Sequence, residues 1–151
     1  MLRARLNDAL KEAMKNRDEV KVNTVRLILA ALKDRDIAAR GKGKLTEIGE
    51  DEILSMLQSM IKQRNESIKL YEQGNRKELA DQERAEIEVI QSFLPEPLSE
   101  EEMAEAIQRT IGEVGASSIK EMGKVMAVLK ENYAGRMDFA KASAVIKERL
   151  G

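Results

Sequence analysis

The chain has 151 residues and a formal net charge of −1, with 42% hydrophobic residues, 35% charged residues and only 3% aromatic residues. It contains no cysteine and no histidine, which excludes disulfides and thiolate metal sites and removes the commonest general base and metal ligand. A core poor in aromatic residues and rich in Ala, Leu, Ile and Met favours helix-on-helix packing over sheets. We therefore expect an all-α protein without a metal or other cofactor.

The first two predicted helices cover about residues 2–16 and 19–40, because apolar residues recur there at helical spacing. Asp18 is the expected N-cap of the second helix, and Gly41 is its stop signal. The apolar stripe of the second helix consists of Val22, Val25, Ile28, Leu29, Leu32 and Ala39.

Two further helices are predicted at about residues 50–72 and 77–93, separated by Gly74 and Asn75. At 1.5 Å per residue the first of them would be roughly 35 Å long. A short break between two such segments predicts a long antiparallel helical hairpin.

Both prolines of the chain, Pro95 and Pro97, follow this hairpin. Proline lacks an amide donor and steers the preceding residue away from helix, so these residues predict a stop and a hinge. We therefore expect an N-terminal domain of about four helices at residues 1–96 and a small three-helix C-terminal domain at residues 97–151.

The C-terminal domain should contain helices at about residues 100–111, 118–131 and 138–150. Ser99, with Glu102 three residues later, is a capping box that starts the first of them. Glycines at positions 112, 115 and 135 separate the helices. Some 54 residues in three helices lie near the lower size limit for independent folding, which predicts marginal stability.

Catalytic chemistry has little support in these residues. The basic loop Gly41-Lys42-Gly43-Lys44 is too short for a P-loop, lies between helices, and continues with Leu45 instead of Ser or Thr. The serines have no histidine to activate them, and the many carboxylates are typical of the solvated faces of amphipathic helices. No residue is assigned a catalytic role.

Arg64 lies on the apolar stripe of the helix at residues 50–72. A buried guanidinium needs a partner, and Glu83 or Glu86 on the antiparallel neighbour is the expected partner in a structural ion pair. The alternative is an anchor for a carboxylate or phosphate from outside.

A first group of cations lies along one side of the second helix. It consists of Arg26, Lys33 and Arg40, spaced seven residues apart and continued into the loop by Lys42 and Lys44. Either these side chains simply lie along the helix edge, or they form a track for phosphates. Asp34 and Asp36 reduce the charge of this track.

A second group of cations lies in the C-terminal domain and consists of Lys120, Lys124, Lys130, Arg136 and Lys141. Acidic neighbours make an ordinary solvated face an equal alternative to an RNA contact, and this domain is near neutral. Tyr133 either stacks on a base or closes the small core.

Several segments together resemble the GatB/YqeY family. They are residues 27–33 (LILAALK), 62–68 (KQRNESI) with Tyr71, 93–99 (FLPEPLS), 122–126 (MGKVM) and 135–138 (GRMD). The resemblance spans essentially the whole chain, and the order and spacing of the segments carry it. It implies kinship with the tail of the B subunit of the glutamine-dependent amidotransferase that converts mischarged Glu-tRNA or Asp-tRNA. In that enzyme the tail engages tRNA, while the catalytic domains lie elsewhere.

For RNA contact, the resemblance points to Gly123, Lys124 and the turn at Gly135 and Arg136. The chain is therefore expected to be a non-catalytic accessory module that binds tRNA or another RNA. The alternative is a protein–protein adaptor without an RNA role. A third reading, carbon–nitrogen ligase activity with glutamine as amido donor, follows from the family label and has no support in the residues.

The apolar segments of the chain are all short. No apolar stretch approaches the roughly 20 residues needed to span a bilayer, and the N-terminus lacks the apolar core of a signal peptide. We therefore expect no membrane partner and a cytoplasmic location.

Overall fold

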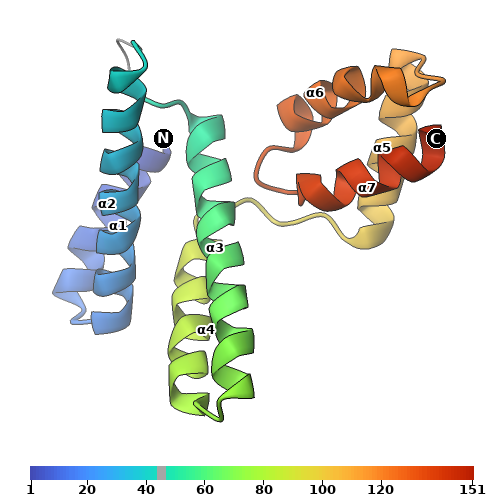
Figure 1. Cartoon of the computed structure of the whole chain (residues 1–151). Coiled ribbons are helices and arrows are strands. Elements are labelled where there is room, and N and C mark those ends of the chain that lie inside the picture. The colour runs from blue at the N-terminus through green and yellow to red at the C-terminus, as the bar shows by residue number, and fades with distance from the viewer. Residues whose placement is uncertain (44–46) are drawn as a thin grey trace. The chain divides into compact units, whose positions relative to one another are not determined.

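The computed structural model describes residues 1–43 and 47–151. These residues form seven α-helices and one 3-10 helix, with no strand among them. The predicted all-α class is confirmed. The chain divides into two compact units, Met1–Pro95 and Glu96–Gly151 (Figure 1).

The first unit contains four α-helices. They are α1 (Leu2–Lys15), α2 (Glu19–Gly41), α3 (Glu50–Gln73) and α4 (Lys77–Gln91). The N-cap predicted for α2 is confirmed, because the Asp18 carboxylate accepts a hydrogen bond of 3.2 Å from the backbone N–H of Lys21. Helices α3 and α4 run side by side as an antiparallel hairpin (Figure 1).

The core of the first unit draws on all four helices. Its fully buried side chains include Leu6, Val25, Ile28, Ile53, Leu57 and Ile90. The far end of the α3–α4 hairpin, around Gly74, extends past α1 and α2 (Figure 1). Along this end only Ile68 and Ala80 are buried. The two helices there bury few apolar groups, so ion pairs between them carry more of the contact.

The second unit packs its helices around a smaller core. The elements are α5 (Glu100–Val114), η1 (Ile119–Glu121), α6 (Met122–Tyr133) and α7 (Phe139–Leu150). Its fully buried apolar side chains are Ile107, Val125, Leu129, Ala142 and Ile146. The predicted capping box at the start of α5 is confirmed, since the Ser99 hydroxyl and the Glu102 carboxylate each accept a backbone N–H of the other residue at 3.1 Å.

Two details differ from the sequence-based expectation. Gly112 does not end its helix: α5 continues to Val114 and ends at Gly115, which has a φ of 72°. Glycine is tolerated inside a helix at a cost of about 1 kcal/mol, whereas the left-handed conformation at Gly115 is one that other residues rarely adopt. Residues 119–121 form a 3-10 turn ahead of α6 where an α-helical turn was predicted, a common way for a helix to begin.

Candidate functional site

Arg64 is engaged inside the α3–α4 hairpin. Its Nε lies 3.1 Å from the Glu86 carboxylate and 3.8 Å from that of Glu83, and one terminal nitrogen donates to the Met60 carbonyl at 3.2 Å. The three charged side chains are only 14–22% exposed. Both carboxylates named from the sequence thus lie within ion-pair distance, and these contacts leave little of Arg64 to anchor an external anion.

The pKa of Glu83 is raised even though its carboxylate lies near the Arg64 guanidinium. Burial is the largest cause, followed by repulsion from Glu86, and the attraction of Arg64 only partly offsets them. The ion pairs of Arg64 join α3 and α4 in the part of the hairpin that buries few apolar groups. The ionised form of Glu83 is the less favourable member of this cluster.

A second ion pair, between Arg3 and Asp36, was missed by sequence reasoning. Two guanidinium nitrogens of Arg3 donate to Asp36 at 2.9 and 2.8 Å, and one of them also donates to the Ile48 carbonyl at 2.9 Å. The Ile48 N–H in turn donates to Asp36 at 3.0 Å. The hydrogen bonds from Arg3 are the main reason that the pKa of Asp36 is lowered, against the effect of burial.

The cations of α2 are displayed on its surface. Arg26, Lys33, Arg40 and Lys42 are all exposed, whereas Lys44 lies outside the described residues. Within the described part of the chain, Arg26 and Lys33 form no ion pair, and the charge of Arg40 helps to lower the pKa of Asp36. Because Asp36 is occupied by Arg3 and Ile48, it neutralises this row less than its position in the sequence indicates.

The cations of the second unit do not form one line. Lys124 and Lys130 are exposed on α6, but six residues of helix place them about 120° apart around its axis. Lys120 lies on η1 and Lys141 in the first turn of α7, both exposed. No ion pair within 4 Å forms among residues 96–151, all of which are described, so these lysines face solvent without a carboxylate partner.

Arg136 differs from these lysines because it holds the start of its own unit. Its Nε donates to the Glu96 carbonyl at 2.9 Å, and its backbone carbonyl accepts from the Leu98 N–H at 2.8 Å. Tyr133, the last residue of α6, is half-buried against the core. Of the two roles considered for Tyr133, the structure supports closing the core.

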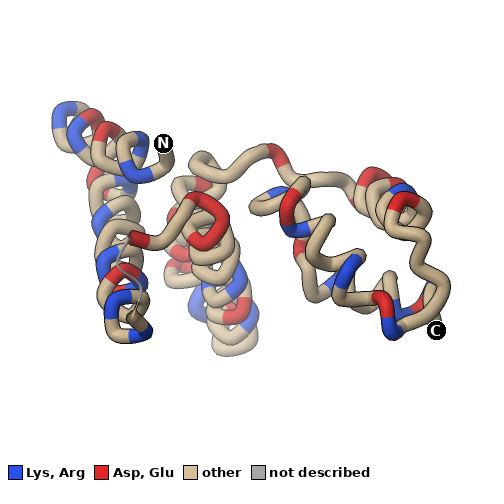
Figure 2. The backbone as a smooth tube through the Cα atoms, turned by 90° about the horizontal axis from the view of Figure 1, so that it is seen from above, with Lys and Arg blue, Asp and Glu red and all other residues tan. Residues whose placement is uncertain are grey.

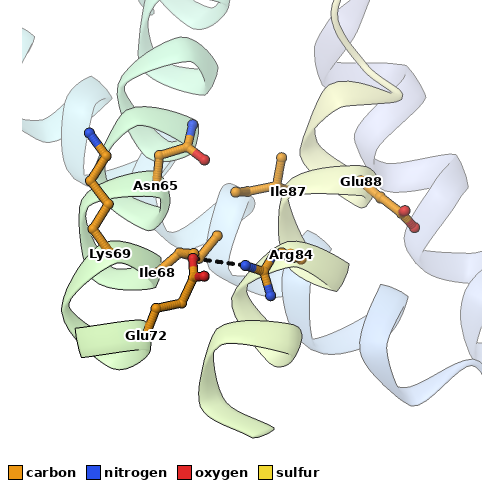
Figure 3. A pocket seen from close by; sticks show the side chains of 7 residues that line it. All are labelled: Asn65, Ile68, Lys69, Glu72, Arg84, Ile87 and Glu88. Atoms are coloured by element: carbon orange, nitrogen blue, oxygen red, sulfur yellow. Dashed lines mark hydrogen bonds and ion pairs between the residues drawn. The ribbon is translucent and has the colours of Figure 1, made fainter. Parts of the chain in front are cut away.

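An open groove of about 640 Å³ lies between α3 and α4, and sequence reasoning did not identify it (Figure 3). Its lining comprises Asn65, Ile68, Lys69, Glu72, Arg84, Ile87 and Glu88. Glu72 and Arg84 point toward each other and form an ion pair of 2.9 Å (Figure 3). Two cations and two carboxylates around two isoleucines provide mixed polar and apolar contacts, but no nucleophile beside a base.

The described residues, 1–43 and 47–151, contain neither a cluster of metal-binding side chains nor a membrane-spanning helix. No group of three or more acidic residues there is arranged to hold a metal ion. Among the helices described, none has the length and apolarity that a membrane crossing requires. Basic and acidic positions are interspersed along the helices of both units (Figure 2).

The described residues form an all-helical protein of two compact units. Some of its cations make internal contacts, and the others are exposed at the surface. The family model described as "Yqey-like protein" matches residues 3–150. The chain belongs to the YqeY-like family.

Curated relatives in yeasts carry the name "Altered inheritance of mitochondria protein 41, mitochondrial". The protein of Candida glabrata is 37% identical over 98 residues, which cover 64% of this chain and 52% of that protein. The protein of Lachancea thermotolerans is 33% identical over 91 residues, covering 60% and 46%. The protein of Saccharomyces cerevisiae is 32% identical over 97 residues, covering 64% and 50%. The chain thus spans about half the length of the curated relatives it matches.

The cytoplasmic location expected from the sequence is corrected by these names. The relatives are named as mitochondrial proteins, which points to mitochondria and away from the cytoplasm. The expectation rested on the lack of long apolar segments, which tests for secretion and membrane insertion. Mitochondrial targeting depends on amphipathic, Arg-rich segments and is untouched by that test.

Proposed function

We propose that this protein is a non-catalytic accessory module that binds tRNA or another RNA through the second unit. The observation that carries the proposal is the set of exposed lysines without an ion-pair partner, Lys120, Lys124, Lys130 and Lys141. A lysine that no carboxylate neutralises is free to contact phosphate and release counterions. The resemblance to the tRNA-engaging tail of an amidotransferase subunit points to the same unit.

The exposed face of α6 supports a contact with the sugar–phosphate backbone of RNA. Gly123 and Ala127 are exposed between Lys124 and Lys130 around the helix. Apart from Gly123's chain neighbours and the adjacent helix backbone, no atom lies within 4 Å of the place where a side chain at Gly123 would begin. The fold therefore does not require glycine there. A small surface flanked by two cations lets a sugar–phosphate chain approach closely, with lysines on either side.

The same proposal treats residues 96–151 as a separate domain that contacts RNA and residues 1–95 as its helical partner domain. Their compactness as two units supports this division. The unit of residues 96–151 carries 8 Lys/Arg and 10 Asp/Glu, so its binding should be modest and local. A glutamine-dependent ligase activity has no supporting residues in the described chain.

The test is a filter-binding titration of the full chain with total tRNA at about 50 and 200 mM salt. We expect saturable binding that weakens several-fold at the higher salt and is lost in Lys124→Glu/Lys130→Glu. Lys62→Glu/Lys69→Glu, on exposed positions of α3, is the matched control and should bind normally. Absence of salt-sensitive binding at tens of micromolar protein, or equal loss in both variants, would refute the proposal.

A variant at Arg136 distinguishes a direct RNA contact from a structural role of this residue. Because its Nε holds the Glu96 carbonyl, Arg136→Ala should lower the stability of the second unit. If RNA affinity falls only in proportion to the folded fraction, Arg136 is a positioning residue and the lysines are the contacts. Circular dichroism on the same samples gives that fraction.

A further inference from the structure

One face of α2 carries three large apolar side chains that lie at the surface. Val20, Leu27 and Ile37 are 46%, 47% and 54% exposed, and they belong to a helix whose opposite side is buried in the core. Helical spacing places them on a common side, together with the exposed Ala30. Isolated exposed hydrophobic residues need no explanation, but several aligned on one helix face do.

The spacing of this face is that of a coiled-coil seam. Val20, Leu27, Ala30 and Ile37 fall on a pattern of alternating three- and four-residue steps, and the two remaining positions hold Asn23 and Asp34. Apolar residues at most seam positions and one or two polar ones are typical of a helix that pairs with a single partner in a fixed register. We call these six residues the outer seam.

The basic row of α2 occupies the positions that flank a coiled-coil seam. Arg26 and Lys33 lie immediately before the seam residues Leu27 and Asp34, and Arg40 follows at the same heptad position beyond Ile37. They are exposed, and in the described part of the chain Arg26 and Lys33 have no ion-pair partner. In paired helices such flanking residues face residues of opposite charge on the partner helix.

We propose that the outer seam of α2 docks an acidic amphipathic helix of a partner protein. The apolar residues of that helix would cover Leu27, Ala30 and Ile37, and its flanking glutamates or aspartates would meet the basic row. The site belongs to the first unit, so it goes beyond RNA binding by the second unit, and either can fail without the other.

A second copy of this chain is a poorer occupant. In an antiparallel pairing of two α2 helices the basic rows would face each other, which is repulsive. In a parallel pairing the row would face positions 24, 31 and 38 of the other copy, where Thr24 is buried in its own core and the two alanines offer no charge. RNA would meet the basic row but would leave the exposed aliphatic side chains unused.

The experiment uses the full chain and a fluorescent probe peptide of three heptads, about 21 residues. Every heptad of the peptide has Leu at its two seam positions and Glu at its two flanking positions. Its twin has Lys in place of every Glu. We expect the Glu peptide to bind with a Kd of about 100 μM or tighter. Amide chemical shifts should change along residues 20–40, and the Lys twin should leave those amides unchanged.

Two variants assign the binding to the seam and to the row. Leu27→Gln/Ile37→Gln and Arg26→Glu/Lys33→Glu change exposed side chains, so circular dichroism should stay at the wild-type level. Each should weaken binding of the Glu peptide about tenfold or more, and the charge reversal should transfer binding to the Lys twin. Leu70→Gln/Lys62→Glu on α3 is the matched control and should behave as wild type.

Three outcomes would overturn the proposal: shift changes that map outside α2, equal binding of the two peptides at α2, or unchanged affinity in Leu27→Gln/Ile37→Gln. The alternative function of the basic row of α2 is to bind nucleic acid. It would replace the proposal if tRNA shifted the same amides while the Glu peptide did not bind. Loss of tRNA binding in Lys124→Glu/Lys130→Glu alone concerns the second unit and leaves this result unaffected.

Discussion

Asp36 joins segments that are distant in the chain. It accepts hydrogen bonds from Arg3 on α1 and from the Ile48 backbone ahead of α3, and its side chain is only 13% exposed. Asp36→Asn removes the charge and one acceptor, so we expect the free energy of unfolding to fall by about 1–2 kcal/mol at pH 7. Urea unfolding measures this. The exposed Asp34→Asn is the control and should change stability by less than about 0.5 kcal/mol.

The contribution of Asp36 should depend on pH in a defined direction. Its folded pKa lies below the ordinary value of 3.8, so the unfolded chain takes up a proton first as pH falls. The difference between wild type and Asp36→Asn should therefore stay constant above about pH 5 and shrink below pH 4. A difference that grows on acidification would contradict the assigned direction of the pKa shift.

Glu83 is expected to behave in the opposite way. Its pKa is raised above the ordinary 4.5 by burial and by Glu86, so its ionised form costs stability at neutral pH. Glu83→Gln should leave the free energy of unfolding unchanged or raise it by less than about 1 kcal/mol at pH 7. That gain should fade as pH falls toward 4.5, where the folded protein is already protonated. Glu86→Gln removes the closer partner of Arg64 and should instead destabilise the hairpin.

At the scale of the helix, the two serine caps of the second unit make a matched comparison. Ser99 caps α5 through a complete capping box, whereas Ser118 stands before η1 without a side-chain cap hydrogen bond. Ser99→Ala should therefore lower the stability of the second unit by roughly 1 kcal/mol, and Ser118→Ala by much less. Thermal unfolding followed by circular dichroism checks both. Equal effects would mean that the α5 cap does not limit stability.

Local signals explain why these helices could be predicted from the sequence. Each of the two caps joins residues only three positions apart, Asp18 with Lys21 and Ser99 with Glu102. The capping hydrogen bonds can therefore form whenever the helix forms. Of the two glycines near the end of α5, only Gly115 needs the left-handed conformation. That requirement depends on where the chain turns, and two glycines three residues apart gave no means of choosing between them.

Contacts between helices were predictable only where one strong constraint applied. Arg64 sat on an apolar stripe, and the antiparallel hairpin left few acidic residues within its reach. The Arg3–Asp36 pair had no such constraint, because 33 residues separate its members and both also fit a solvated face. The groove between α3 and α4 was missed for the same reason: its lining comes from both helices, as with Ile68 and Ile87, and no sequence motif marks it.

At the scale of the whole molecule, the two cores differ in size. The first unit buries apolar residues from four helices. The second unit has a smaller core around Ile107 and Leu129 and contains no ion pair within 4 Å. A core drawn from 56 residues excludes less apolar surface from water per residue than one drawn from 95. The second unit should therefore open before the first.

Hydrogen exchange with mass spectrometry in increasing urea tests this order. Peptides from α5, α6 and α7 should lose protection at a lower urea concentration than peptides from α2 and α3, in two separate steps. Bound tRNA, if it engages the lysines around α6, should raise the first step and leave the second in place, because a ligand stabilises only the unit that it binds. The Glu peptide docked on α2 should do the reverse. A single step for all peptides would show that the two units unfold as one and would remove the physical basis for treating their binding surfaces as independent.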